Sequence, residues 1–147
     1  GSAFASGRGE VLEHFDLELP YWILVVTPQI LISTSWAYAN VKVPPQSADH
    51  LKSIVTDFVR SPSKLAAQLR NDFESLVFAT YPEVANIKEM LIQEGALLAL
   101  MSGSGSSVYG LFSDEEGASL AAVRFSRSYY TSLTEPFFKP ESASLQG

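Results

Sequence analysis

The 147-residue chain contains no cysteine, and this absence excludes several kinds of chemistry. Without cysteine the protein forms no disulfide, no cysteine-ligated zinc site and no thiol nucleophile. A cysteine-free chain also fits a reducing compartment, so we expect the protein to be cytoplasmic. Histidine is scarce as well: His14 and His50 stand far apart, with no partner at metal-ligand spacing, and we expect both on the surface.

Basic charge is also scarce. The chain has 10 Lys and Arg residues against 16 Asp and Glu residues, which gives a net charge of −6 and a pI of about 4.8. A protein that binds nucleic acid along its backbone needs clustered basic residues, and here they are scattered. An acidic surface is equally unsuited to an anionic membrane. The longest apolar run, at 21–27, is too short to cross a bilayer. We therefore expect neither a nucleic-acid nor a membrane partner.

The pattern of apolar residues predicts an α+β fold. Residues 1–18 are typical of two short strands around the turn Gly7-Arg8-Gly9, and the run at 21–26 predicts a strand buried on both faces. Apolar residues at helical spacing predict further helices, and short β-rich runs predict further strands. The predicted helices are a short one near 36–38 capped by Ser33 or Thr34, then 47–59, 62–77, 82–95 ending at Gly95, and 113–125 opened by a capping box of Ser113 and Glu116; the predicted strands are 96–101, 108–112 and 129–133. This order is a ferredoxin-like split βαββαβ arrangement with extra helices after the first strand.

The segment Ser102-Gly103-Ser104-Gly105-Ser106-Ser107 is the sharpest local feature. Small residues let backbone N–H groups approach a ligand closely, and consecutive N–H groups can form an anion-binding nest. The segment is not a Walker A loop, because no Gly-Lys-Ser/Thr follows, and it joins two strands rather than opening a helix as a dinucleotide fingerprint does. Two interpretations stay open at this point: a flexible hairpin connection and a ligand-facing loop.

Other polar and aromatic residues are less specific. The carboxylates of Asp72 and Glu74 are two residues apart, so they do not share a helix face, and their spacing favours a solvated surface. Arg8 could reach a phosphate, although an arginine in a turn usually faces water. The aromatic residues Trp22, Trp36 and Tyr38 are most simply core or interface residues. The residues alone do not identify a reaction.

Four stretches, in this order and spacing, resemble the diphosphocytidyl-methylerythritol kinases, a family within the GHMP kinase superfamily. They are 1–10, then 21–28 followed by 32–38, then 71–74 with 81–83 and 87–89, and finally 99–112. The last stretch matches the third conserved motif of the superfamily, and alone it would also fit homoserine, mevalonate or galactose kinases. The resemblance covers nearly the whole chain, to about Pro140.

This resemblance implies a division into three parts. Residues 19–134 would be a GHMP kinase carboxy-terminal domain, preceded at 1–18 by residual strands of an amino-terminal catalytic domain and followed at 135–147 by a flexible tail. Enzymes of this family transfer the γ-phosphate of ATP, with Mg²⁺, to the 2-hydroxyl of a cytidine-diphosphate substrate. Their ATP-phosphate loop and their catalytic Lys and Asp lie in the amino-terminal half, which would be this chain's partner. The chain alone is thus expected to hold no catalytic residue, no metal and no cofactor, and to be inactive.

The resemblance also assigns roles to residues of this chain. Thr34 and Tyr38 would face the cytidine end of the substrate, with Tyr38 against the cytosine ring. Gly103, Ser104 and Gly105 would line the cleft near the transferred phosphate. Asp72 and Glu74 match a family motif and would be structural.

One departure from the family is visible at Gln29-Ile30-Leu31, where its members often have Gly-x-His. This difference removes any polar side-chain contact expected at position 31. Two alternatives remain: the carboxy-terminal domain of a homoserine- or mevalonate-type GHMP kinase, and a free-standing ferredoxin-like binding module. The sequence does not indicate an oligomeric state.

Overall fold

The computed structural model describes residues 2–6, 10–43 and 48–139. The expected turn at Gly7-Arg8-Gly9 and most of the expected tail lie outside these residues. The elements, in chain order, are β1 (Ser2–Ser6), β2 (Val11–Phe15), β3 (Trp22–Thr27), α1 (Thr34–Asn40), α2 (Ala48–Phe58), α3 (Pro62–Gln68), α4 (Glu74–Thr80), α5 (Pro82–Gln93), β4 (Leu98–Met101), β5 (Val108–Phe112), α6 (Glu115–Ser126) and β6 (Tyr130–Thr134).

Strands β3 to β6 form an antiparallel four-stranded sheet in the order β4-β5-β3-β6. Counted in chain order from β3, this lateral order is second, third, first, fourth, which is the ferredoxin-like arrangement. The expected order of one strand, several helices, two strands, a helix and a last strand is confirmed. Strand β3 is central, and Leu24 on it faces Gly110 of β5 on one side and Leu133 of β6 on the other.

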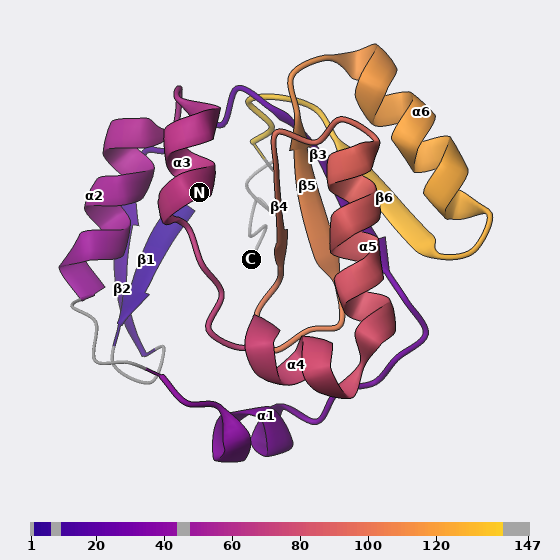
Figure 1. Cartoon of the computed structure of the whole chain (residues 1–147). Coiled ribbons are helices and arrows are strands. Elements are labelled where there is room, and N and C mark those ends of the chain that lie inside the picture. Colours follow the sequence, from indigo (N-terminus) through magenta and orange to yellow (C-terminus); the bar gives the residue numbers. More distant parts are fainter. Residues whose placement is uncertain (1, 7–9, 44–47, 140–147) are drawn as a thin grey trace, which may run out of the picture.

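Helices α5 and α6 cover one face of this sheet (Figure 1). Leu24 and Val26 of β3 are fully buried there, in a core shared with Ile87 and Leu91 of α5 and Phe125 of α6. Glycine at position 110 lets α5 approach closely, since a Cβ there would lie 3.2 Å from a methyl carbon of Leu91. Alternation along each strand directs the other side chains to the opposite face.

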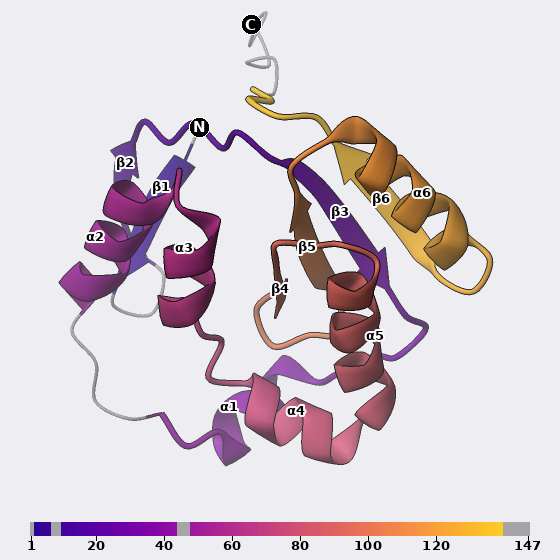
Figure 2. The ribbon, with the colours of Figure 1, turned by 45° about the horizontal axis from the view of Figure 1, so that its top comes forward.

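Helices α2 and α3 lie on the opposite face, together with the separate β1–β2 hairpin (Figure 2). Their contact with the sheet is a second core cluster made by Tyr21, Ile54, Leu65, Leu98, Leu100 and Leu111. Tyr21 also donates a hydrogen bond from its hydroxyl to the carbonyl of Val59, at 2.6 Å. The apolar run predicts burial of β3 on both faces; this is confirmed for Leu24 and Val26, whereas Ile23 and Val25 on the opposite face are only partly buried. An ion pair between Lys52 and Glu13 joins α2 to the hairpin.

The helix predicted at 62–77 is wrong, because the structure divides it into α3 and α4. Leu69 has an extended backbone, with φ −74° and ψ 132°, and the chain re-enters a helix only at Glu74. The side chain of Asn71 accepts a hydrogen bond from the N–H of Phe73 at 2.9 Å. Such a local turn competes with the helical hydrogen bonds and explains the interruption.

The helix ends confirm two predictions, at Ser33 and at Gly95, and correct a third. Ser33 caps α1, since its hydroxyl accepts a hydrogen bond from the N–H of Trp36. Gly95 follows α5 with φ +103°, which explains the glycine there. The capping box of Ser113 and Glu116 is wrong: Asp114 caps α6, and its carboxylate accepts a hydrogen bond from the N–H of Gly117 at 2.8 Å. Asp114 already has the extended backbone that a cap requires.

Candidate functional site

The glycine- and serine-rich segment joins β4 to β5 as a hydrogen-bonded turn. The N–H of Ser102 donates to the carbonyl of Ser107 at 2.8 Å, and the N–H of Gly105 donates back to the carbonyl of Ser102 at 3.0 Å. Gly103 and Gly105 have φ of +55° and +86°, a region that side chains with a Cβ rarely adopt. The backbone of this turn therefore requires both glycines.

This turn packs against the segment that follows β3. The hydroxyl of Ser106 donates to the carbonyl of Ile30 at 2.6 Å, and the hydroxyls of Ser107 and Thr27 lie 2.8 Å apart. Gly105 is also tightly enclosed, since a Cβ there would lie 2.8 Å from the sulfur of Met101. Segments about 75 residues apart in the sequence thus form one structural unit, with the turn at its centre.

A second set of contacts reaches the turn from the interruption between α3 and α4. The amide nitrogen of Asn71 donates to the carbonyls of Met101 and Gly103, at 2.6 and 2.8 Å. One carboxylate oxygen of Glu74 accepts the N–H of Met101 at 2.9 Å, and the other pairs with the ammonium of Lys88 at 2.7 Å. Because β4 is an edge strand, these side chains satisfy backbone groups that have no neighbouring strand.

The residues expected to bind substrate gather around this turn. The hydroxyl oxygens of Thr34 and Ser104 lie 3.5 Å apart. Tyr38 packs edge-on against Phe73, with 5.0 Å between the ring centroids, while 67% of the residue is exposed. Tyr38 is therefore not a core residue, and most of its surface is exposed.

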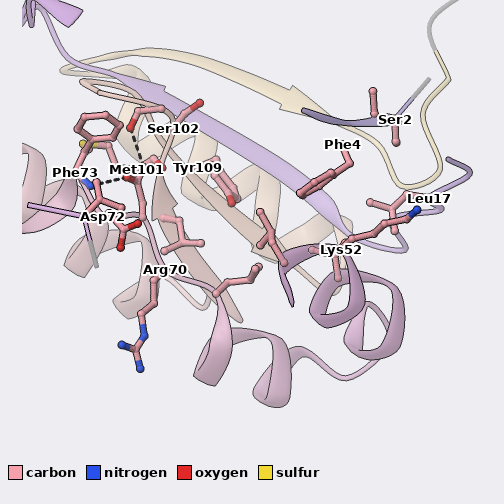
Figure 3. Close-up of a pocket in the computed structure, with 18 of the residues that line it drawn as sticks. Ser2, Phe4, Leu17, Lys52, Arg70, Asp72, Phe73, Met101, Ser102 and Tyr109 are labelled. Atoms are coloured by element: carbon pink, nitrogen blue, oxygen red, sulfur yellow. Dashed lines mark hydrogen bonds between the residues drawn. The ribbon is translucent and has the colours of Figure 1, made fainter. Parts of the chain in front are cut away.

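A cavity of about 800 Å³ opens beside these residues (Figure 3). Phe73, Asp72 and Ser102 lie at one end, and Phe4 and Leu17 lie at the other. Its further lining residues are Ser2, Ala3, Phe15, Tyr38, Val43, Leu51, Lys52, Val55, Leu69, Arg70, Asn71, Leu100, Met101, Gly103 and Tyr109. Of the expected site residues, Tyr38 and Gly103 line the cavity, whereas Thr34, Ser104 and Gly105 do not.

The cavity wall is mostly apolar, and one titratable group in it has a shifted pKa. Burial raises the pKa of the Tyr109 phenol above its usual value, and the negative charge of Glu74 raises it further. Lys52, Arg70 and Asp72 supply charge around the opening. The cavity thus combines apolar walls with a few polar groups, as ligand sites in proteins commonly do.

The structure changes the interpretation of two residues, Glu74 and Asn71. The solvated-surface position expected for Glu74 is wrong, because its side chain is only 15% exposed and holds the edge of β4. Asn71 was missed as a site residue, although its place before an acidic helix start could have indicated a turn. Leu31, where the resembling family often has a histidine, is 98% exposed.

The described residues offer no metal site, since no group of three or more His, Cys, Asp or Glu lies close enough together to hold an ion. Within the same residues, no helix is long and apolar enough to cross a membrane.

Known proteins are similar to this chain in sequence and in fold. A chain segment at 53–131, more than half of the protein, matches the family model described as GHMP kinases C terminal. The 4-diphosphocytidyl-2-C-methyl-D-erythritol kinase of Chlorobium phaeobacteroides (strain BS1) is 43% identical over 141 residues, which cover 94% of this chain and 49% of that protein. The kinase of the same name from Geobacter metallireducens is 38% identical over 127 residues, or 86% of this chain and 44% of that protein.

Solved structures of kinases have a similar fold. A crystal structure of 4-(cytidine 5'-diphospho)-2C-methyl-D-erythritol kinase superposes with a TM-score of 0.73 at 26% identity, over 89% of this chain and 48% of that one. Homoserine kinase from Cytophaga hutchinsonii superposes with a TM-score of 0.63 at 16% identity, over 84% of this chain and 44% of that one, which shows a shared fold. The chain spans about half the length of the curated relatives it matches. It belongs to the GHMP kinase family and corresponds to the carboxy-terminal part of these enzymes.

Proposed function

We propose that the chain is the substrate-side domain of an ATP-dependent kinase that phosphorylates the 2-hydroxyl of 4-diphosphocytidyl-2-C-methyl-D-erythritol. The observation that carries this proposal is that Tyr38 and Gly103 line one cavity while the hydroxyl of Thr34 lies 3.5 Å from that of Ser104 in the same turn, in a chain 43% identical to a kinase of that name. The exposed ring of Tyr38 is suited to stacking on a nucleobase. Thr34 and Ser104 offer hydroxyls beside it.

Catalysis and substrate binding would be divided between the two halves of the complete kinase. The ATP-phosphate loop, the catalytic Lys and Asp and the Mg²⁺ ligands would lie in the amino-terminal half, with residues 1–18 as its last strands. Phosphoryl transfer depends on positioning and on neutralising charge, and the bound Mg²⁺ supplies part of the second. The residues of this chain would bind and orient the acceptor substrate. A cytoplasmic location is part of the same proposal.

The chain by itself provides the first test. Purified chain, incubated with Mg-ATP and the cytidine substrate, should release no ADP. The matching half of the C. phaeobacteroides kinase can then be replaced by this chain, and the hybrid should turn over at about 1–100 per second, as kinases commonly do.

Three results would overturn the proposal. Turnover by the chain alone would show that it contains a complete active site. A hybrid that phosphorylates homoserine or mevalonate but not the cytidine substrate would assign the domain to another GHMP kinase. A folded hybrid with no kinase activity towards any of these alcohols would favour a free-standing binding module.

A further inference from the structure

We propose that Asn71 is a positioning residue for the glycine-rich turn, and that it orients the peptide between Gly103 and Ser104 for phosphoryl transfer. This inference rests on the proposed function. Asn71 contacts the turn through one amide nitrogen, which donates to the carbonyls of Met101 and Gly103 at 2.6 and 2.8 Å. These two carbonyls flank Ser102, so a single side chain fixes the entry to the turn.

Peptide planarity extends this effect to the next residue. The C=O of Gly103 and the N–H of Ser104 belong to one planar trans unit and point in opposite directions. When Asn71 holds that carbonyl, the N–H of Ser104 is directed to the other side of the turn. No hydrogen bond among the described residues uses this N–H, whereas the N–H of Gly105 is already bonded to Ser102. The N–H of Ser104 is thus a donor of the turn, set in direction by Asn71, that is available to an anionic group.

Asn71 is itself held in place from two sides. Its carbonyl oxygen accepts the N–H of Phe73 at 2.9 Å, which fixes the side-chain rotamer. Three residues on, Glu74 accepts the N–H of Met101 and is anchored by Lys88. The geometry requires an amide, because it must accept from one backbone N–H and donate to two carbonyls. An aspartate would place a negative acceptor against those carbonyl oxygens.

The test compares Asn71→Asp with Asn86→Asp, the same chemical change on an exposed residue of α5. Asn71→Ala removes the two donated bonds without adding a carboxylate and serves as the second variant if Asn71→Asp does not fold. In the purified chain, either change at Asn71 should speed hydrogen exchange of the Gly105 amide at least tenfold and shift the Ser104 amide resonance. Asn86→Asp should do neither. An unchanged Gly105 exchange rate in the folded Asn71 variants would show that Asn71 does not fix the turn and would overturn the proposal.

Kinetics of the complete kinase then separate positioning from mere stability. Asn71→Asp and Asn71→Ala should lower kcat at least tenfold at temperatures where both are folded. The KM for the cytidine substrate should stay within about threefold, because the side chain of Asn71 makes its hydrogen bonds to Met101, Gly103 and Phe73 and none directly to Tyr38 or Thr34. Faster Gly105 exchange with an unchanged kcat would leave the proposed function standing and overturn the positioning role. An inactive wild-type enzyme would instead overturn the proposed function and the positioning role with it. The exchange data would still decide whether the side chain of Asn71 fixes the turn.

Discussion

The carboxylate of Glu74 accepts a hydrogen bond from the backbone N–H of Met101 at 2.9 Å, and this contact joins the first residue of α4 to the last residue of β4. Met101 lies on a sheet edge, and none of the strands in the described part of the chain takes that N–H. Its carbonyl accepts a hydrogen bond from the side chain of Asn71, so side chains replace a neighbouring strand where the glycine-rich turn begins. The sheet edge and the turn therefore depend on one short segment between two helices.

Removing this carboxylate should destabilise the protein. Glu74→Ala leaves the N–H of Met101 without its partner and the ammonium of Lys88 without its counter-charge. Hydrogen bonds to charged groups contribute about 1.5–3 kcal/mol, and we expect a loss in that range in urea unfolding of the chain. Glu89→Ala, at an exposed position of α5, is the matched control and should cost less than about 0.5 kcal/mol. Equal losses in both variants would show that the contact contributes nothing specific.

The two glycines of the turn should differ in their sensitivity to substitution. At Gly103, with φ +55°, a Cβ meets nothing within 4 Å, so Gly103→Ala should cost only the backbone penalty of about 1–2 kcal/mol. At Gly105, with φ +86°, a Cβ would lie 2.8 Å from the sulfur of Met101 and 3.0 Å from a methyl carbon of Ile32. Gly105→Ala should therefore add about 1–3 kcal/mol of overpacking, visible as the lower thermal midpoint of the two. A smaller loss at Gly105 than at Gly103 would contradict this packing.

The sheet could be predicted from the sequence because its signals are local. The apolar run at 21–26, the two short runs flanking 102–107 and the glycine after α5 each identify an element without reference to the rest of the chain. The order of these elements then restricts the topology to the ferredoxin-like form.

The interruption at 69–73 could not be predicted in the same way. Leu65, Leu69, Phe73 and Leu76 keep helical spacing across it, and only the side chain of Asn71 reveals the turn. The carbonyls of Met101 and Gly103, whose hydrogen bonds to Asn71 stabilise this turn, lie about 30 residues further along the chain. The cavity was beyond sequence reasoning too, since its lining comes from elements at both ends of the chain.

Stability should fall at alkaline pH in part through Tyr109. Burial raises the pKa of this phenol above 10.0 in the folded protein, and the charge of Glu74 adds to the shift. The folded state therefore favours the neutral phenol: this contribution is complete below pH 10 and is lost as the pH rises through the folded pKa. Tyr109→Phe keeps the ring and removes the ionisable group, so the unfolding free energy should fall less steeply above pH 10.

Denaturant unfolding at several pH values, together with absorbance titration of the phenols, measures this difference. Tyr130→Phe is the matched control, because that residue is 75% exposed and should leave the alkaline slope unchanged. Burial also raises the pKa of Tyr21 and Tyr129, so part of the slope remains in every variant. Identical slopes for the wild type and Tyr109→Phe would mean that the phenol of Tyr109 is solvated in solution.

The most local prediction concerns Tyr38 as a stacking platform for the cytosine base. Its ring rests edge-on against Phe73, which fixes its orientation, and 67% of the residue is exposed at the cavity. Base–aromatic stacking contributes roughly 1–3 kcal/mol per base. In the complete kinase, Tyr38→Ala should therefore raise the KM for the cytidine substrate about 5- to 150-fold. Tyr38→Phe keeps the aromatic face and should change it little.

The KM for ATP and the protein's stability distinguish stacking from a packing role for Tyr38. Because the side chain is mostly exposed, Tyr38→Ala should cost well under the roughly 3–5 kcal/mol expected for a truncated core aromatic. The KM for ATP should stay constant in both variants, since the nucleotide would bind the other half. Tyr130→Ala, which removes an exposed tyrosine from β6, is the control for nonspecific effects and should leave both constants unchanged. A large loss of stability with an unchanged KM for the cytidine substrate would make Tyr38 a packing residue, because a ring that stacks on the base cannot be removed without weakening that substrate's binding.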